Sequence, residues 1–125
     1  CVRAKKEVGA APGTMKLVHT AMVDAVNAPL GTAHQASLER VSVAGKTGTA
    51  QWGPKEKERT AAWFAGFVPA DHPQYAFAAL YEGEVGSTVH GGSAAAPMIG
   101  KILRASYGKG GENEKTTDQE SDESD

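Results

Sequence analysis

The sequence predicts an α+β fold in which a three-stranded antiparallel sheet is covered by helices. Three observations carry this prediction: strand-like segments rich in β-branched, aromatic and small apolar residues follow one another, short turn-rich connections separate them, and segments with helical spacing flank them. Short connections favour antiparallel neighbours, because a parallel pair needs a crossover of about a dozen residues. The predicted elements are helix 14–27, strands 41–52, 61–68 and 74–82, and helix 93–106.

The first predicted helix follows residues 1–13, which lack periodicity and are interpreted as a linker or loop. Thr14 can cap this helix, apolar side chains recur three and four residues apart along it, and Pro29 and Gly31 end it. Residues 30–39 are polar and irregular, so we expect a loop there.

The next three segments have the character of strands. Residues 41–52 are β-branched and show no helical stripe, residues 61–68 end at Pro69, and residues 74–82 alternate large and small side chains. After a glycine-rich connection the helical spacing returns, and Pro97 is compatible with the first turn of the last helix.

The length and composition of the chain exclude several classes of protein. The 125 residues make about one domain, and 13 Lys and Arg nearly balance 15 Asp and Glu, which argues against a nucleic-acid partner. No run of about 18 apolar residues occurs, and no short apolar segment follows basic residues near the start, so neither a transmembrane helix nor a secretory signal is predicted. Cys1 is the only cysteine, which excludes a disulfide within the chain.

The C-terminal end of the chain differs in composition from the rest. Residues 107–125 hold seven acidic side chains and two lysines, and no apolar residue follows Tyr107, so we predict a disordered acidic tail at 108–125.

The chain starts with cysteine instead of methionine, and the predicted sheet exposes an edge at residues 41–52. Both observations predict that residues 14–107 belong to a longer polypeptide.

Lys46, Thr47, Gly48 and Thr49 carry the clearest chemical pattern. A glycine weakens a strand and a mid-strand lysine needs polar surroundings, so this run is costly for packing alone. A glycine lets a ligand approach the backbone, an exposed strand edge offers N–H groups to an oxyanion or a peptide, and the lysine attracts a carboxylate. A solvent-facing lysine on an ordinary edge strand is the alternative interpretation of a bare K-T-G.

Four sequence blocks extend this pattern. The chain reads VAGKTGTAQ at 43–51, WFAGFVP at 63–69, GG and then AAP within 91–97, and KIL at 101–103. K-T-G is one of the motifs of penicillin-binding proteins and class A β-lactamases. From about residue 14 to 107 the chain resembles the C-terminal part of the transpeptidase domain of class B penicillin-binding proteins, most closely the elongation type, penicillin-binding protein 2. The resemblance implies the fold shared by serine β-lactamases and penicillin-binding proteins.

The resemblance also implies a role for each residue of the motif. Lys46 would lie against the catalytic serine, assist proton transfer and attract the substrate carboxylate. Thr47 and Thr49 would flank the cleft, where the Thr49 hydroxyl binds the carboxylate of a D-alanyl peptide or β-lactam and its backbone N–H forms half of the oxyanion hole. Gly48 would keep the strand edge open. No cofactor and no metal ion is implied, and the four histidines lack metal-like spacing.

The two other motifs of the family are missing. In the family, the serine nucleophile and its lysine base stand in S-x-x-K, upstream of K-T-G. The only match here, Ser106 to Lys109, follows K-T-G, and no S-x-N occurs. Many relatives have a histidine just before the Trp-Phe strand, where this chain has Thr60 and Ala61. We therefore expect the chain to form one wall of the active-site cleft and to lack the nucleophile.

The leading hypothesis is part of a D,D-transpeptidase that cross-links peptidoglycan and is acylated by β-lactam antibiotics. The implied partners are D-Ala-D-Ala stem peptides, the remainder of the transpeptidase domain and a cell-wall glycosyltransferase, at the periplasmic face of the bacterial inner membrane. The alternatives are a D,D-carboxypeptidase or β-lactamase-like hydrolase, and a non-catalytic penicillin-recognising sensor domain.

Trp52 and Trp63 are predicted to be core residues, with a place at the border of a substrate groove as the alternative.

Overall fold

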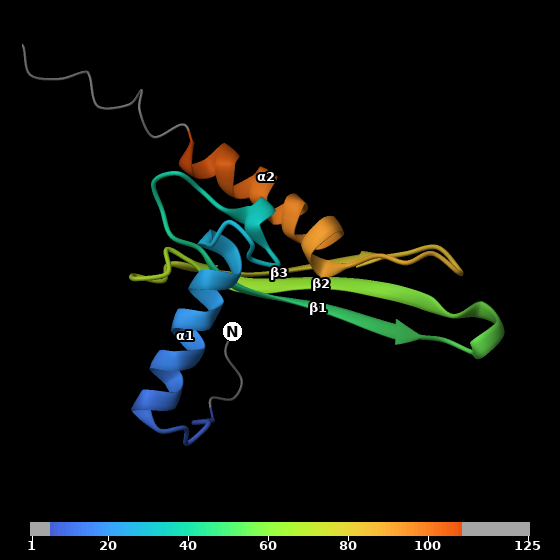
Figure 1. The fold of residues 1–125 in the computed structure, drawn as a ribbon, viewed down its shortest axis with the longest axis horizontal. Coiled ribbons are helices and arrows are strands. Elements are labelled where there is room, and N and C mark those ends of the chain that lie inside the picture. Colours follow the sequence, from blue (N-terminus) through green and yellow to red (C-terminus); the bar gives the residue numbers. More distant parts are fainter. Residues whose placement is uncertain (1–5, 109–125) are drawn as a thin grey trace, which may run out of the picture.

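The three strands of the chain form one antiparallel sheet in the order β1-β2-β3 (Figure 1). The computed structural model describes residues 6–108. In it, β1 is Ala44–Trp52, β2 is Arg59–Val68 and β3 is Tyr75–Glu82. Thr47 lies opposite Phe64 in the register of the first pair. The predicted sheet and its antiparallel order are confirmed.

Strand β1 begins at Ala44, later than the predicted residue 41. The carbonyl of Ser42 accepts a hydrogen bond from the N–H of Ala70 at 2.7 Å, so this part of the chain bonds to the turn after β2 instead of continuing the ladder. Val43 is nevertheless fully buried. The prediction of a strand here is confirmed, and its predicted start at residue 41 was wrong.

Helix α1 comprises Pro12–Asn27 and packs against β1, while α2 comprises Ala96–Tyr107 and lies along one face of the sheet (Figure 1). The first helix starts before the predicted Thr14, because proline suits the first helical turn and Ala11 occupies the N-cap position. The prediction that Thr14 caps this helix was therefore wrong. Residues 6–11 have no regular secondary structure, so the expected linker ends before Pro12.

Three short helical turns complete the described fold. Turn η1, His34–Ala36, lies inside the predicted loop and packs against α2. Turn η2, Lys55–Lys57, connects β1 and β2. The expected single helix from residue 93 is divided into a π-turn, η3, at Gly91–Ala95 and the regular helix α2, with Pro97 in its first turn as expected.

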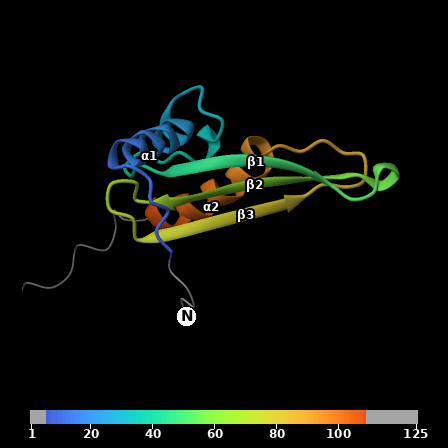
Figure 2. The ribbon, with the colours of Figure 1, turned by 90° about the horizontal axis from the view of Figure 1, so that it is seen from below.

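The core lies between the sheet and α2. Its largest fully buried side chains are Phe64, Val26, Val43 and Val68. The rings of Phe64 and Phe77 lie 5.2 Å apart, and α2 contributes Ile99 and Leu103 to the same cluster. Figure 2 shows the sheet from its other side, where no described helix lies across the strands. We call these the covered face and the open face.

The predicted disordered tail falls on residues 109–125, outside the described residues, except for Gly108 at the end of α2. Within residues 6–108, no helix combines the length and hydropathy needed to span a membrane.

Candidate active site

The K-T-G segment lies in the middle of β1, at an edge of the sheet. β1 pairs with β2 on one side, and no strand of residues 6–108 pairs with its other side. Side chains alternate along a strand, so Lys46 and Gly48 belong to the open face, and Thr47 and Thr49 belong to the covered face. The four predicted site residues thus border one free backbone edge from both faces of the sheet.

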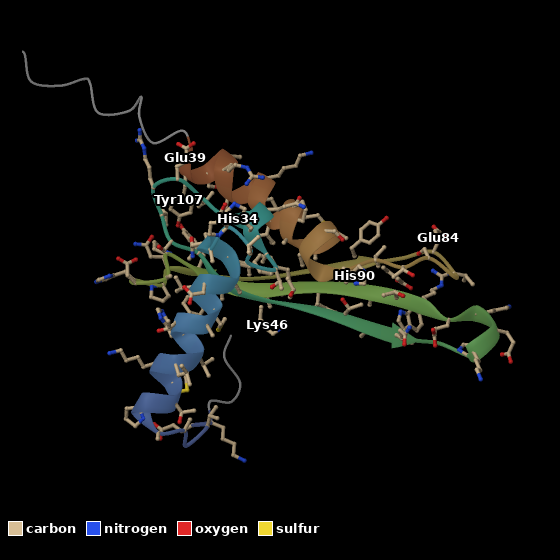
Figure 3. All side chains as sticks on the ribbon, viewed as in Figure 1. His34, Glu39, Lys46, Glu84, His90 and Tyr107 are labelled. Carbon is tan, nitrogen blue, oxygen red and sulfur yellow. The ribbon has the colours of Figure 1, made fainter. Side chains whose placement is uncertain are left out.

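Lys46 projects from the open face, on the side of the sheet away from α2 (Figure 3). Its side chain is exposed, and Nζ donates a hydrogen bond to the carbonyl of Thr47 at 2.7 Å. The ion pairs described within residues 6–108 join other residues, Arg59 with Glu82 and His72 with Asp71. No described acid therefore neutralises the Lys46 ammonium, which leaves it able to attract an anionic ligand.

Gly48 has no packing reason to be glycine within the described chain. A Cβ atom at this position would meet only the Cβ of Trp63, at 3.5 Å, which is an ordinary van der Waals distance. Alanine would fit, although glycine costs a strand conformational entropy. A glycine at a position where a side chain would fit leaves room for close approach of another group to this part of β1.

The two threonines differ in their hydrogen bonds. The hydroxyl of Thr47 donates to the hydroxyl of Thr32 at 3.3 Å. The hydroxyl of Thr49 is exposed and makes no hydrogen bond to any residue between 6 and 108. No residue between 6 and 108 uses the hydroxyl hydrogen of Thr49, so it is available to a ligand.

The only S-x-x-K match does not contribute to this site. Ser106 lies in the last turn of α2, and its hydroxyl donates to the carbonyl of Ile102 at 3.2 Å. Lys109 lies outside the described residues. In the part of the chain that the structure describes, no three His, Cys, Asp or Glu side chains gather into a possible metal site.

The prediction that both tryptophans belong to the core was wrong. Trp52 is 50% exposed and Trp63 is 42% exposed, because both lie on the open face. With Ala50, Ala61, Leu80 and Glu82 they line a shallow cavity of about 290 Å³. This cavity shares strand β1 with the K-T-G segment.

A larger cavity, of about 560 Å³, lies away from the K-T-G segment, between residues 37–41 and the end of α2. It contains none of the four predicted site residues. Sequence reasoning also missed Thr32, whose contact with Thr47 spans 15 positions of the chain and leaves no local pattern.

The chain is similar in sequence and in structure to known transpeptidase domains. The family described as the penicillin-binding protein transpeptidase domain matches residues 3–104. Stage V sporulation protein D of Bacillus subtilis (strain 168) is 38% identical over 79 residues, which cover 61% of this chain and 12% of that protein. The transpeptidase domain of the FtsI4 D,D-transpeptidase from Legionella pneumophila superimposes with a TM-score of 0.63 and 32% identity, over 77% of this chain and 36% of that one. The chain spans a minor part of the length of both relatives.

Proposed function

The chain belongs to the penicillin-binding protein transpeptidase domain family, and on this premise we propose that it forms part of a peptidoglycan D,D-transpeptidase. Residues 14–107 are the C-terminal part of that domain and supply the K-T-G wall of its active site. The serine nucleophile and the S-x-N residues come from polypeptide outside this chain. The chain alone is then inactive.

The observation that carries this proposal is the set of unused groups along the free edge of β1. The ammonium of Lys46 has no acidic partner among residues 6–108, the hydroxyl of Thr49 has no hydrogen-bond partner there, and space remains beside Gly48. A cation, a hydroxyl donor and an open backbone edge together suit a peptide that ends in a carboxylate.

In the proposed reaction, the serine oxygen attacks the carbonyl carbon between the two D-alanines of a stem peptide. Lys46 lies against this serine, assists its proton transfer and attracts the terminal carboxylate. The backbone N–H of Thr49 contributes to the oxyanion hole, and its side chain binds the carboxylate. The carbon–nitrogen bond breaks, and the terminal D-alanine leaves with a proton on its amine. An amine of a neighbouring stem then attacks the carbonyl carbon of the serine ester, forms the new amide bond and gives up a proton, while the carbon–oxygen bond breaks and the serine oxygen regains its proton. A β-lactam acylates the same serine.

The protein class, its location and its partner are inferred from the resemblance of the sequence blocks. The match to WFAGFVP at 63–69 and AAP at 95–97 supports a class B protein of the elongation type. We place its active site on the periplasmic face of the bacterial inner membrane, with a cell-wall glycosyltransferase as partner. The same blocks argue against a carboxypeptidase or a β-lactamase-like hydrolase.

The test is a partition experiment with a complete transpeptidase domain that contains this chain. A D-Ala-D-Ala peptide is incubated with the domain and an amine acceptor, and the products are separated by mass. A transpeptidase couples the acceptor to the peptide and releases D-alanine. Hydrolysed peptide without coupled product identifies a carboxypeptidase, and no reaction together with no penicillin adduct overturns the assignment of catalytic activity.

A further inference from the structure

Two segments far apart in the sequence meet behind the K-T-G strand, on the covered face. Thr32, from the connection after α1, accepts the hydrogen bond of the Thr47 hydroxyl at 3.3 Å. Gly92 of η3 lies directly against this connection, since a Cβ atom on Gly92 would collide with the carbonyl oxygen of Thr32 and lie 4.0 Å from the methyl group of Thr47. Gly91 lies against the backbone of Gly48, where an added Cβ would be 2.9 Å from its oxygen and 3.0 Å from its nitrogen.

Both segments are held by the body of the fold. The N–H of Ala33 donates to the carbonyl of Ala25 in α1 at 2.9 Å, and the side chain of Ala33 is fully buried. In η3, the N–H of Ala94 donates to the carbonyl of His90 at 2.9 Å, and Ala95 is fully buried. The backbone next to Thr32 is therefore fixed, although the side chain of Thr32 is exposed.

The contact between Thr47 and Thr32 constrains the side chain of Thr47. The two hydroxyl oxygens lie 3.3 Å apart, and a threonine hydroxyl can both donate and accept, so the contact persists whichever of the two is the donor. In either arrangement it links the side chain of Thr47 to Thr32 before any ligand arrives.

Resting on the proposed function, we propose that Thr32 is a positioning residue for the transpeptidase site. Its hydroxyl fixes the side chain of Thr47 and, through it, the backbone of Thr47 and Gly48 beside the Thr49 half of the oxyanion hole. Preorganised donors stabilise a transition state because they need no rearrangement when charge develops. Thr32 touches no substrate and acts only through Thr47.

The first experiment compares Thr32→Val with Thr32→Ser in a complete transpeptidase domain that contains this chain. Valine keeps the shape and removes the hydroxyl, whereas serine keeps the hydroxyl. At saturating labelled penicillin we expect Thr32→Val to acylate about fivefold more slowly, the scale of one neutral hydrogen bond, and Thr32→Ser to stay within about twofold of wild type. The thermal midpoints should agree, since Thr32 is exposed. A valine variant as fast as wild type, or a serine variant as slow as valine, overturns the proposal.

A double-mutant cycle with Thr47→Val separates positioning from a general structural effect. Because Thr32 acts through Thr47, Thr32→Val should slow acylation no further once the Thr47 hydroxyl is gone. Independent, multiplicative effects of the two substitutions contradict the proposed coupling.

Amide hydrogen exchange gives a readout that does not use penicillin. Thr32→Val should speed exchange within residues 46–49 and leave other strand amides unchanged. If the wild-type domain takes up no penicillin, the proposed function fails, and Thr32 is judged by exchange alone. Faster exchange confined to residues 46–49 supports positioning, and unchanged exchange there refutes it.

Discussion

The two faces of the sheet are built from the same strands but meet different surroundings. On the covered face, Phe64 is fully buried beneath α2 and η3. On the open face, its sequence neighbour Trp63 is 42% exposed, beside the exposed Leu80 and Trp52. The covered face forms a buried core. The open face is contacted by α1 near Phe67, whose ring lies 5.7 Å from that of His19, whereas around Trp63 it is apolar and exposed. An exposed apolar surface of this kind is typical of a contact site.

The free edge of β1 that carries the K-T-G segment lies where these two faces meet. Thr47 is held from the covered face by Thr32, while Lys46 extends from the open face without a described acidic partner. The difference indicates that the two sides of β1 have different roles. The covered-face side of the strand is held by Thr32, and the open-face side carries an ammonium group that has no acidic partner among residues 6–108.

The largest expected effect contrasts the adjacent residues Phe64 and Trp63. Phe64→Ala should lower the free energy of unfolding by about 3–5 kcal/mol, because it leaves a cavity in the core. Trp63→Ala should cost about 1 kcal/mol or less in this chain, because its side chain is already half in water. Urea unfolding measures both values. Equal losses would show that the open face is packed as tightly as the covered one.

The next effect concerns Lys46 on the open face. In a complete transpeptidase domain, Lys46→Ala should slow acylation by labelled penicillin by about 10²-fold or more, the scale of a positioned general acid or base. The thermal midpoint should stay close to wild type, since the side chain is exposed. Lys101→Ala, at an exposed position of α2, is the matched control and should leave the rate unchanged. An unchanged rate for Lys46→Ala would remove this lysine from the mechanism.

A smaller effect is expected for Thr49. Thr49→Val keeps the side-chain shape and removes the hydroxyl, so the second-order rate of acylation should fall about tenfold, the scale of a hydrogen bond to a charged group. The loss should be smaller for a β-lactam whose carboxylate is esterified, because the charged acceptor is then missing. Equal losses with both compounds would show that Thr49 does not bind the carboxylate.

The sequence predicts the type and order of the main elements because their patterns are local. Segments rich in β-branched, aromatic and small apolar residues mark the three strands, and turn residues separate them. Boundaries are predicted less well. The start of β1 depends on a tertiary contact, the hydrogen bond between Ala70 and Ser42. The start of α1 was misassigned although Pro12 is a local signal for the first helical turn.

The site is predictable only in part, for the same reason. The K-T-G motif is contiguous, so its place in a strand follows from the sequence. The contact of Thr32 with Thr47 and the approach of Gly92 join distant segments, and no single-sequence pattern predicts them. The tryptophans were misassigned because aromatic residues in a strand indicate an apolar face but do not show whether another element covers it.

The division between a K-T-G wall in this chain and a nucleophile outside it is tested most directly by intact mass spectrometry. This chain and a complete transpeptidase domain containing it are incubated with a penicillin under the same conditions. We expect the chain alone to keep its unmodified mass, because it lacks an activated serine. The complete domain should gain one penicilloyl group per molecule, on a serine outside these 125 residues. A stoichiometric adduct on any serine of the chain itself would contradict this division.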